Sequence, residues 1–226
     1  MIDFNPATDM WLFDDFLGNS DSGLIATTSG ASASTTGVAV ASTATEYGIA
    51  TMSSGTDTTG RAQRSTAATA YLFGNAIWRS RFKVQIPTLS TAAQEYIAHC
   101  GFFDDLAGAD ATDGAYFYYD RLTDGNFWTL KTASNSSRTK TVTAVAVTAG
   151  QWYNMEIFVN AAANLAQFFI DGTLVKAETA TIPSGAGRQT GWSFGGVKSA
   201  GGTDTNMIAC DFVSVFSRMK TPRYAA

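Results

Sequence analysis

Between Trp78 and Ile86 the chain alternates between buried-type and polar residues. One parity holds Trp, Ser, Phe, Val and Ile, and the other holds Arg, Arg, Lys and Gln. Because successive side chains of a β-strand point to opposite faces of the sheet, this pattern predicts a strand with one buried and one solvated face. Pro87 follows and removes a backbone donor, so we expect the strand to end there.

Similar short apolar runs recur from residue 96 to the C-terminal part of the chain, at intervals typical of antiparallel sandwiches. Asp-Gly pairs at 113–114, 124–125 and 171–172 separate some of them, and the last pair is flanked like a tight hairpin. No long stretch has apolar residues at helical spacing. The pattern predicts an all-β fold with strands at 96–103, 115–121, 127–131, 139–147, 152–159, 165–171, 173–179 and 207–217.

The first 70 residues carry a weaker signal. Residues 11–17 read as an opening strand or hook and 47–55 as a short strand. Residues 25–44 are nearly all Ala, Ser, Thr and Gly with two valines, a composition that suits β-structure but supplies little core. A strand-loop crossing is expected at 56–69 and a helical turn at 91–95. We predict one domain over 1–226, with 1–70 as a looser N-terminal layer or partner-attachment segment.

Composition supports a folded β-protein despite its low complexity. Ala (35), Thr (30), Gly (21) and Ser (19) make up 105 of 226 residues, and charged residues are only 15%. The 28 aromatic residues (15 Phe, 5 Trp and 8 Tyr) and the 45% hydrophobic fraction argue against disorder. Four prolines and the absence of an 18-residue apolar run exclude collagen and a membrane-spanning helix.

Charge is distributed unevenly along the chain. Residues 1–60 contain seven acidic residues and no Lys or Arg, so a basic N-terminal arm is excluded and no nucleic-acid partner is expected. The first eleven residues lack the basic and apolar regions of a secretory signal, which indicates synthesis in a cytosol. Cys100 and Cys210 lack metal-ligand spacing; buried reduced thiols are the first expectation, and one disulfide is the alternative.

Catalytic constellations are scarce. His99 is the single histidine, and no HExxH motif occurs. No glutamate lies two or four residues from another acid, so the paired carboxylates that glycoside hydrolysis needs are missing; Glu156 shares strand parity only with Trp152, Asn154 and Phe158. The protein is therefore predicted not to be an enzyme.

Two segments carry a family resemblance. They are residues 151–160 (QWYNMEIFVN) and 166–175 (AQFFIDGTLV). Together they resemble the W-Y strand and the F-x-D-G hairpin of concanavalin A-like jelly rolls, the laminin-G and legume-lectin type of two-sheet antiparallel sandwich. The resemblance implies that fold for this chain. Alginate lyases of this superfamily use a Gln-x-His strand with Arg and Tyr; only Ala98-His99 stands here, although Arg79, Arg81, His99 and Tyr118 could meet on one sheet.

An ordered set of motifs resembles modules of tailed-bacteriophage virion proteins. The set comprises residues 14–18, 47–49, 54–56, 81–90, 100–102 and 113–120. This resemblance implies a non-enzymatic structural protein made in the host cytoplasm and located in the virion, as a capsid decoration or a head or tail fibre component, with adhesion to cell-surface glycans as an added role. Its partners would be other virion proteins, copies of itself and surface polysaccharide. The alternative is a carbohydrate-binding module or polysaccharide-degrading enzyme of the same fold.

Two groups of residues are candidates for ligand binding. Tyr116, Tyr118 and Trp128 could stack on sugar rings, since the C–H faces of pyranoses pack on aromatic surfaces, whereas core packing is the alternative. Four carboxylates could donate oxygens to calcium, although they do not match an EF-hand loop and a solvated acidic loop is the alternative. They are Asp104, Asp105, Asp110 and Asp113.

Overall fold

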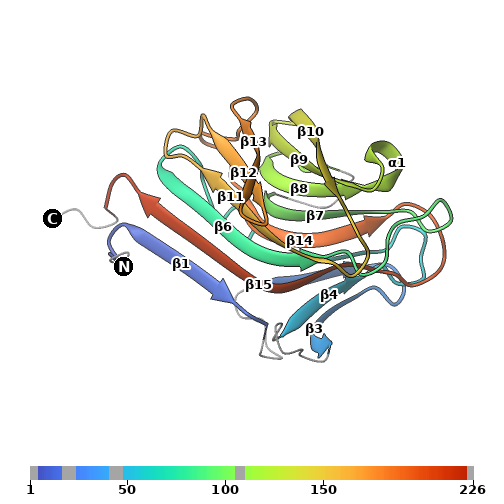
Figure 1. Cartoon of the computed structure of the whole chain (residues 1–226). Helices are drawn as coiled ribbons and strands as arrows, with labels where there is room; N and C mark the ends of the chain where they lie inside the picture. The colour runs from blue at the N-terminus through green and yellow to red at the C-terminus, as the bar shows by residue number, and fades with distance from the viewer. Residues whose placement is uncertain (1–4, 17–23, 41–47, 105–109, 223–226) are drawn as a thin grey trace.

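In a computed structural model the chain forms two antiparallel sheets packed face to face, as the sequence predicts (Figure 1). The structure describes residues 5–16, 24–40, 48–104 and 110–222. Sheet A comprises β1 (Asp9–Asp14), β3 (Ser34–Val40), β4 (Ile49–Ser53), β6 (Ala76–Gln85), β11 (Trp152–Val159), β12 (Ala166–Ile170), β13 (Thr173–Glu178) and β15 (Asn206–Met219). Sheet B comprises β2 (Ile25–Ser29), β5 (Arg61–Ser65), β7 (Tyr96–Phe103), β8 (Gly114–Asp120), β9 (Phe127–Ser134), β10 (Ser137–Ala146) and β14 (Gly191–Lys198).

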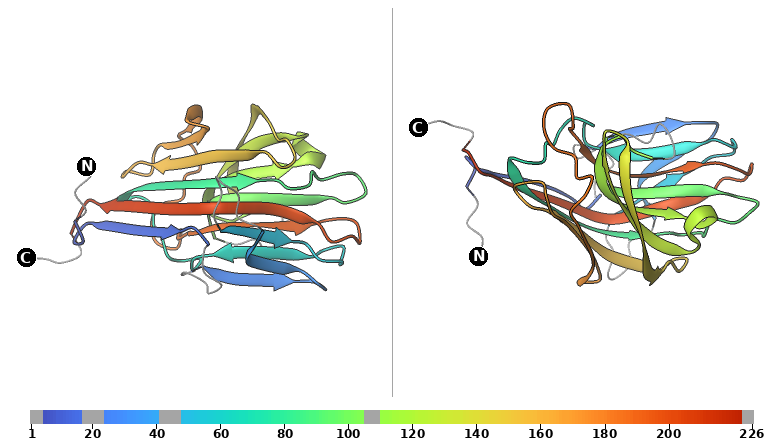
Figure 2. Two further views of the ribbon diagram at one scale, coloured as in Figure 1. Left: turned by 60° about the horizontal axis from the view of Figure 1, so that its bottom comes forward. Right: turned by 90° about the horizontal axis from the view of Figure 1, so that it is seen from above.

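Strand order brings distant parts of the chain together. Sheet A runs β13-β12-β11-β6-β15-β4-β3, and β1 pairs with the second half of β15. Sheet B runs β10-β9-β8-β7-β14-β5-β2. Figure 2 shows β6 and β15, the two longest strands of sheet A, side by side along the molecule. The middle of sheet A is thus built from segments more than a hundred residues apart in the sequence.

The core fills the space between the sheets with aromatic rings. Phe82 of β6 meets Phe117 of β8 and Trp192 of β14 edge-on, at ring-centroid distances of 6.1 and 5.6 Å. Phe168 of β12 meets Phe117 at 5.5 Å. Such edge-to-face contacts add to the free energy gained by burying the rings. Side chains of the opposite parity on each strand point to the outer face of its sheet.

The structure confirms the expected alternation of β6. Trp78, Phe82 and Val84 are buried, and the arginines of the other parity, Arg79 and Arg81, are exposed to solvent with 38% and 55% of their side-chain surface. The observed bounds of β7 and β11 equal the predicted ones. The hairpin at Asp171-Gly172 joins β12 to β13, and both residues have positive φ, as a two-residue turn requires.

Some elements differ from the sequence expectation. The stretch 191–198 forms β14, which no alternation indicated, because both parities of this strand are buried and glycine replaces side chains. A Cβ at Gly196 would come within 2.8 Å of the Met207 sulfur, so the close packing there requires glycine. The helical turn expected at 91–95 is a hydrogen-bonded turn closed by Thr91 and Gln94, and a four-residue helix, α1 (Arg121–Asp124), lies elsewhere.

The first 70 residues contribute strands to both sheets. β4 is buried along its whole length, whereas β2 is exposed along its whole length at the edge of sheet B. Cys100 and Cys210 are free and buried, and burial raises the pKa of both thiols. Neither thiol is therefore poised to react at neutral pH.

Candidate functional site

The aromatic residues singled out from the sequence are enclosed. Trp128 is 0% exposed and lies in the core, with its ring centroid 5.6 Å from that of Tyr153. Tyr116 and Tyr118 project from β8 to the outer face of sheet B, yet they are only 0% and 3% exposed. None of the three offers an open ring surface to a sugar.

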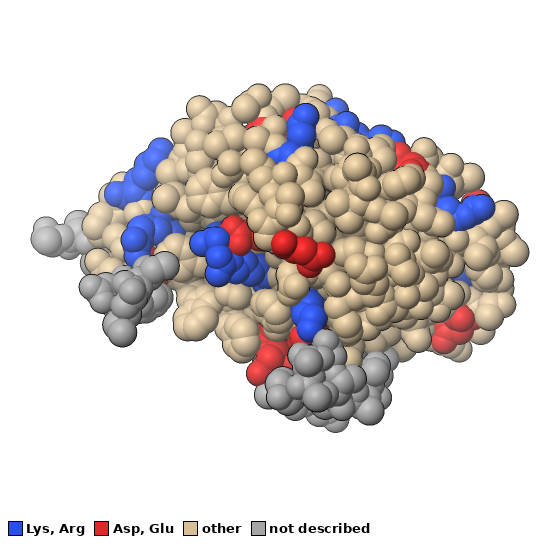
Figure 3. All heavy atoms as spheres, in the orientation of Figure 1, with Lys and Arg blue, Asp and Glu red and all other residues tan. Residues whose placement is uncertain are grey.

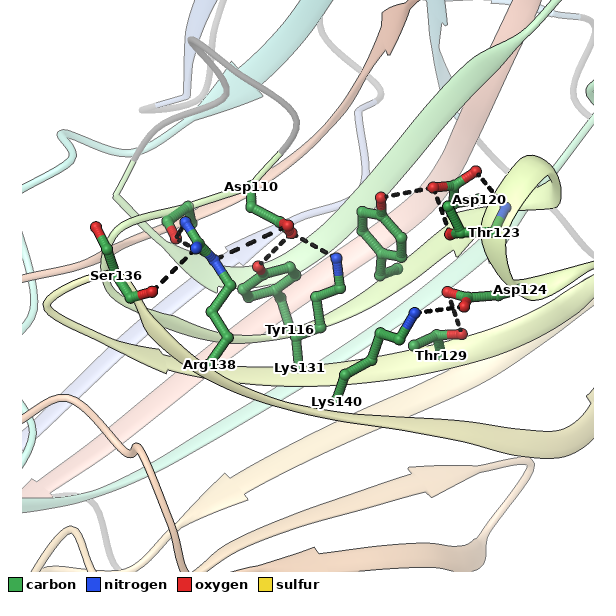
Figure 4. Close-up of polar contacts among 12 residues, drawn as sticks. Asp110, Tyr116, Asp120, Thr123, Asp124, Thr129, Lys131, Ser136, Arg138 and Lys140 are labelled. Carbon is green, nitrogen blue, oxygen red and sulfur yellow. Dashed lines mark hydrogen bonds and ion pairs between the residues drawn. The ribbon is translucent and has the colours of Figure 1, made fainter.

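A closed polar cluster surrounds the two tyrosines. Asp110 accepts hydrogen bonds from the Tyr116 hydroxyl at 3.1 Å and from Lys131 Nζ at 2.5 Å, and Arg138 Nε lies 3.9 Å from its other oxygen (Figure 4). Lys131 Nζ also lies 3.3 Å from the centre of the Tyr118 ring. Burial lowers the pKa of Lys131, and its bond to Asp110 opposes that shift. These side chains are partners for one another's polar groups. We call Asp110, Tyr116, Tyr118, Lys131 and Arg138 the sheet B cluster.

The sheet B cluster continues toward α1. The Tyr118 hydroxyl donates to Asp120, which also accepts from the backbone N–H groups of Leu122 and Thr123 and so caps the helix (Figure 4). His99 packs beside Tyr118 with a ring-centroid distance of 4.9 Å and is 0% exposed. The single histidine of the chain is therefore enclosed among aromatic rings.

The carboxylates proposed for calcium serve protein donors in this structure. Asp104 accepts from the backbone N–H of Thr112 and of Asp113, at 2.9 and 3.1 Å. Asp113 in turn accepts from the Asn135 N–H at 2.9 Å and pairs with Arg188 at 3.1 Å. Asp110 belongs to the sheet B cluster, and Asp105 lies outside the described residues. Within the described part of the chain no group of three His, Cys, Asp or Glu side chains could hold a metal ion.

The arginine, histidine and tyrosine residues of an alginate-lyase arrangement do not meet. Arg79 and Arg81 lie on the outer face of sheet A, whereas His99 and Tyr118 lie on the outer face of sheet B. The expectation that these four side chains could share one sheet is wrong. The core of the molecule separates the two pairs, because each belongs to the outward parity of its own sheet.

The outer face of sheet A holds a different combination of side chains in register. Trp11 of β1 pairs with Phe216 of β15, Phe216 pairs with Arg79 of β6, and Arg79 pairs with Phe158 of β11. These four residues form one row across four strands. Neighbouring strands lie about 4.8 Å apart, so the row spans about 14 Å.

A second row runs beside the first, two residues along each strand. It contains Phe13, Ser214, Arg81, Glu156 and Phe169 in neighbouring registers. The Trp11 indole N–H donates to the Ser214 hydroxyl at 2.9 Å and so ties the two rows together. We call both rows the arginine–aromatic face.

Glu156 fixes the two arginines on this face. Arg79 donates to it through Nε at 2.8 Å and through Nη2 at 2.9 Å, and Arg81 donates through Nε at 2.7 Å. Burial would raise the pKa of Glu156, but the hydrogen bonds and positive charges of both arginines outweigh burial, so its pKa is lowered. Glu156 is therefore an anion that holds the guanidinium groups in place.

Two hollows flank the arginine pair. The first, of about 420 Å³, is lined by Trp11, Ile77, Phe158, Ser214 and Phe216 together with Arg79 and Arg81. The second, of about 440 Å³, lies on the other side of the same arginines, toward Asn154, Glu156, Phe169 and Phe212. The described residues that line the first hollow include no carboxylate.

This face keeps large aromatic surface in contact with solvent. Trp11 is 63% exposed and Phe13 is 53% exposed, with their ring centroids 6.2 Å apart. In Figure 3, basic and acidic side chains gather where β6 and β15 cross the view, with uncharged atoms on both sides of them. Exposed rings beside charged hydrogen-bond donors are the features of a polar-ligand site rather than of a core.

Strand parity could have revealed part of this face. The outward parity of 78–86 contains both arginines, and the outward parity of 152–159 contains Glu156 and Phe158. The sequence does not show that these strands are neighbours or that Trp11 lies at the end of the row. That arrangement depends on pairings between residues separated by 75 positions or more in the chain.

The fold is shared with lectins and glucanases of very different sequence. Peanut lectin superposes with a TM-score of 0.62 at 11% identity, covering 94% of this chain and 99% of the lectin. An endo-1,3-beta-glucanase from Streptomyces sioyaensis superposes with a TM-score of 0.59 at 10% identity, covering 97% and 100%. The protein is thus a jelly-roll sandwich of the concanavalin A-like class.

Within that class, the SO2946-like C-terminal domain family matches residues 45–211, and the chain belongs to this family. The crystal structure of SO2946, a protein of unknown function from Shewanella oneidensis MR-1, superposes with a TM-score of 0.71 at 14% identity, covering 100% of this chain and 92% of that one. The comparison with curated proteins gives no significant match. Among the described residues, no helix has the length and apolar character needed to cross a membrane.

Proposed function

We propose that this protein is a non-enzymatic glycan-binding module and that the arginine–aromatic face holds the glycan. The observation that carries the proposal is the row of Trp11, Phe216, Arg79 and Phe158 beside an open hollow of about 420 Å³. Aromatic rings offer stacking surfaces for the C–H faces of sugars, and the guanidinium groups offer donors for sugar oxygens at the rim. Sharing a fold with peanut lectin is consistent with this role.

The charges on this face argue for binding rather than hydrolysis. Among the described residues, Glu156 is the one carboxylate that lines the two hollows. Glycoside hydrolysis requires a second carboxyl group and an acid whose pKa is raised, whereas the two arginines lower the pKa of Glu156. The lowered pKa of Glu156 therefore supports binding of a sugar without its cleavage.

The first test measures binding to a glycan array, comparing the natural chain with Trp11→Ala. Because Trp11 is 63% exposed, the variant should fold normally and lose about tenfold or more in affinity, the worth of a stacked aromatic contact. The matched control is Phe127→Ala, which removes an aromatic ring 39% exposed on sheet B. Equal binding by the natural chain and Trp11→Ala would rule out the arginine–aromatic face as the site.

The non-enzymatic assignment has its own test. Polysaccharides that bind in the array are incubated with the protein, and the products are separated by size. We expect no shortening of the polymer over hours. Release of oligosaccharides that Glu156→Gln abolishes would instead make Glu156 a catalytic residue and overturn the assignment.

A location in a virion is a second proposal, and it rests on the ordered motifs that resemble phage virion modules. Two features of the fold suit attachment to a partner or to another copy of the chain. β2, made of Ile25 and small residues, is exposed along its length at one edge of sheet B, and among the described residues β1 pairs with β15 alone. Quantitative mass spectrometry of purified particles tests the location: absence of stoichiometric copies would reject it.

A further inference from the structure

We infer that the arginine–aromatic face selects an acidic sugar, and that the guanidinium of Arg81 receives the sugar carboxylate. The inference rests on the proposed function and names the class of glycan that the same face takes. It follows from the donors that remain open, from the charge balance of the face, and from the position of the aromatic rings relative to Arg81.

Arg81 has unused donors. Among the described residues its hydrogen bond is to Glu156 through Nε, and 55% of its side chain is exposed. A guanidinium carries five N–H groups, so four remain on the two terminal nitrogens. Their planar arrangement matches the two oxygens of a carboxylate, which makes a bidentate contact the favoured one.

The arginine–aromatic face carries a net positive charge at Arg79 and Arg81. Arg79 and Arg81 contribute two positive charges and Glu156 contributes one negative charge, which leaves a net charge of +1. The neighbouring cations are each paired with an acid: Lys83 lies 3.4 Å from Asp211, and Arg218 lies 2.8 Å from Asp9. The residual positive charge therefore lies at the arginine pair, beside the hollow without a carboxylate.

The aromatic surface lies at the right place for a sugar ring that bears a carboxylate. Ser214 is the cross-strand neighbour of Arg81, and its hydroxyl accepts the indole N–H of Trp11. The exposed Trp11 ring is thus fixed across one strand from the guanidinium. A uronic acid residue has an apolar C–H face for the ring and a carboxylate at its edge for Arg81, so one sugar unit can make both contacts.

A neutral sugar would use this face less completely. It could stack on Trp11, but it would bring no negative charge to the guanidinium of Arg81. It would also displace part of the water bound to that guanidinium without replacing it by a charged partner. A charged hydrogen bond contributes more than a neutral one. We therefore expect the carboxylate to decide selectivity and the aromatic rings to supply affinity common to all ligands.

The test uses isothermal titration of the full chain with oligogalacturonate, oligoalginate and hyaluronan fragments, each paired with its carboxyl-reduced, neutral form. We expect at least one acidic oligosaccharide to bind about tenfold or more tightly than its reduced partner. Arg81→Gln should abolish that preference, because the affinity for the acidic form should fall to about that for the neutral form. Trp11→Ala should weaken binding of both forms.

The matched control is Arg121→Gln, which removes an arginine of α1 on the opposite side of the molecule and should leave the preference intact. Equal affinity for an acidic fragment and its reduced form would overturn the inference while leaving glycan binding in place. A preference that survives in Arg81→Gln would also overturn it, since the carboxylate would then bind elsewhere. Absence of binding to every fragment, acidic or neutral, would overturn the inference together with the proposed function.

Discussion

The outer faces of the two sheets contain the same kinds of residues and use them in opposite ways. On sheet B, Tyr116, Tyr118 and Lys131 are buried, and their polar atoms are satisfied by Asp110 and Asp120. On sheet A, Trp11 is open to solvent, and the guanidinium edges next to it lack that enclosure. The number of aromatic and charged residues does not identify a binding face. Exposed ring surface and unused donors identify it.

The comparison predicts that two tryptophans respond differently to the same change. Trp128→Ala removes a fully buried ring and should cost about 3–5 kcal/mol of unfolding free energy, enough to leave much of the protein unfolded. Trp11→Ala should change stability by no more than about 0.5 kcal/mol. Urea unfolding followed by circular dichroism measures both. Similar losses in the two variants would mean that Trp11 is a structural residue.

The sheet B cluster should matter for stability and not for binding. Lys131→Met leaves Asp110 without its closest cation and removes the cation from the Tyr118 ring, so we expect a loss of about 2–3 kcal/mol. The variant should still bind any glycan that the natural chain binds, when tested below its unfolding temperature. Loss of binding with unchanged stability would show that the sheet B face is the functional one.

The smallest expected effect concerns pH. The pKa of Glu156 is lowered in the folded state, so its ion pairs stabilise the fold above the ordinary carboxyl pKa, and this contribution is lost as pH falls through the lowered value. Glu156 is partly exposed, which limits the effect to less than about 1 kcal/mol. The unfolding free energies of the natural chain and Glu156→Gln should therefore differ at pH 6 and converge as the pH falls to 3. A constant difference would mean that the arginines do not shift this pKa.

The strands with clean alternation could be predicted from sequence, and with them one side of the candidate site. The parity of 78–86 separates Arg79 and Arg81 from the core residues, and the bounds of β11 follow from its own pattern. The family resemblance of residues 151–160 and 166–175 implies the jelly-roll class, which the observed sheets confirm.

The rest depends on information that local patterns do not contain. The run Ala115–Asp120 has aromatic residues on both parities, so the sequence does not show that Phe117 and Tyr119 face the core while Tyr116 and Tyr118 face outward. β14 escapes detection because glycine supplies its close packing. The contact of Arg81 with Glu156 depends on a pairing across 75 residues, and only the assembled sheet determines it.

The pairing of β1 with β15 has a consequence for how the protein is made. Trp11 lies in a strand whose single sheet partner, in the described chain, is β15, and its hydrogen-bond partner Ser214 follows it by 203 residues. β1 starts and β15 ends at the same end of the molecule (Figure 1). Trp11 can contact Ser214 and Phe216 only after these residues have been synthesised, and contacts between such distant segments form slowly. A nascent chain that does not yet include β15 therefore cannot form the arginine–aromatic face. The face forms only once β15 has joined sheet A.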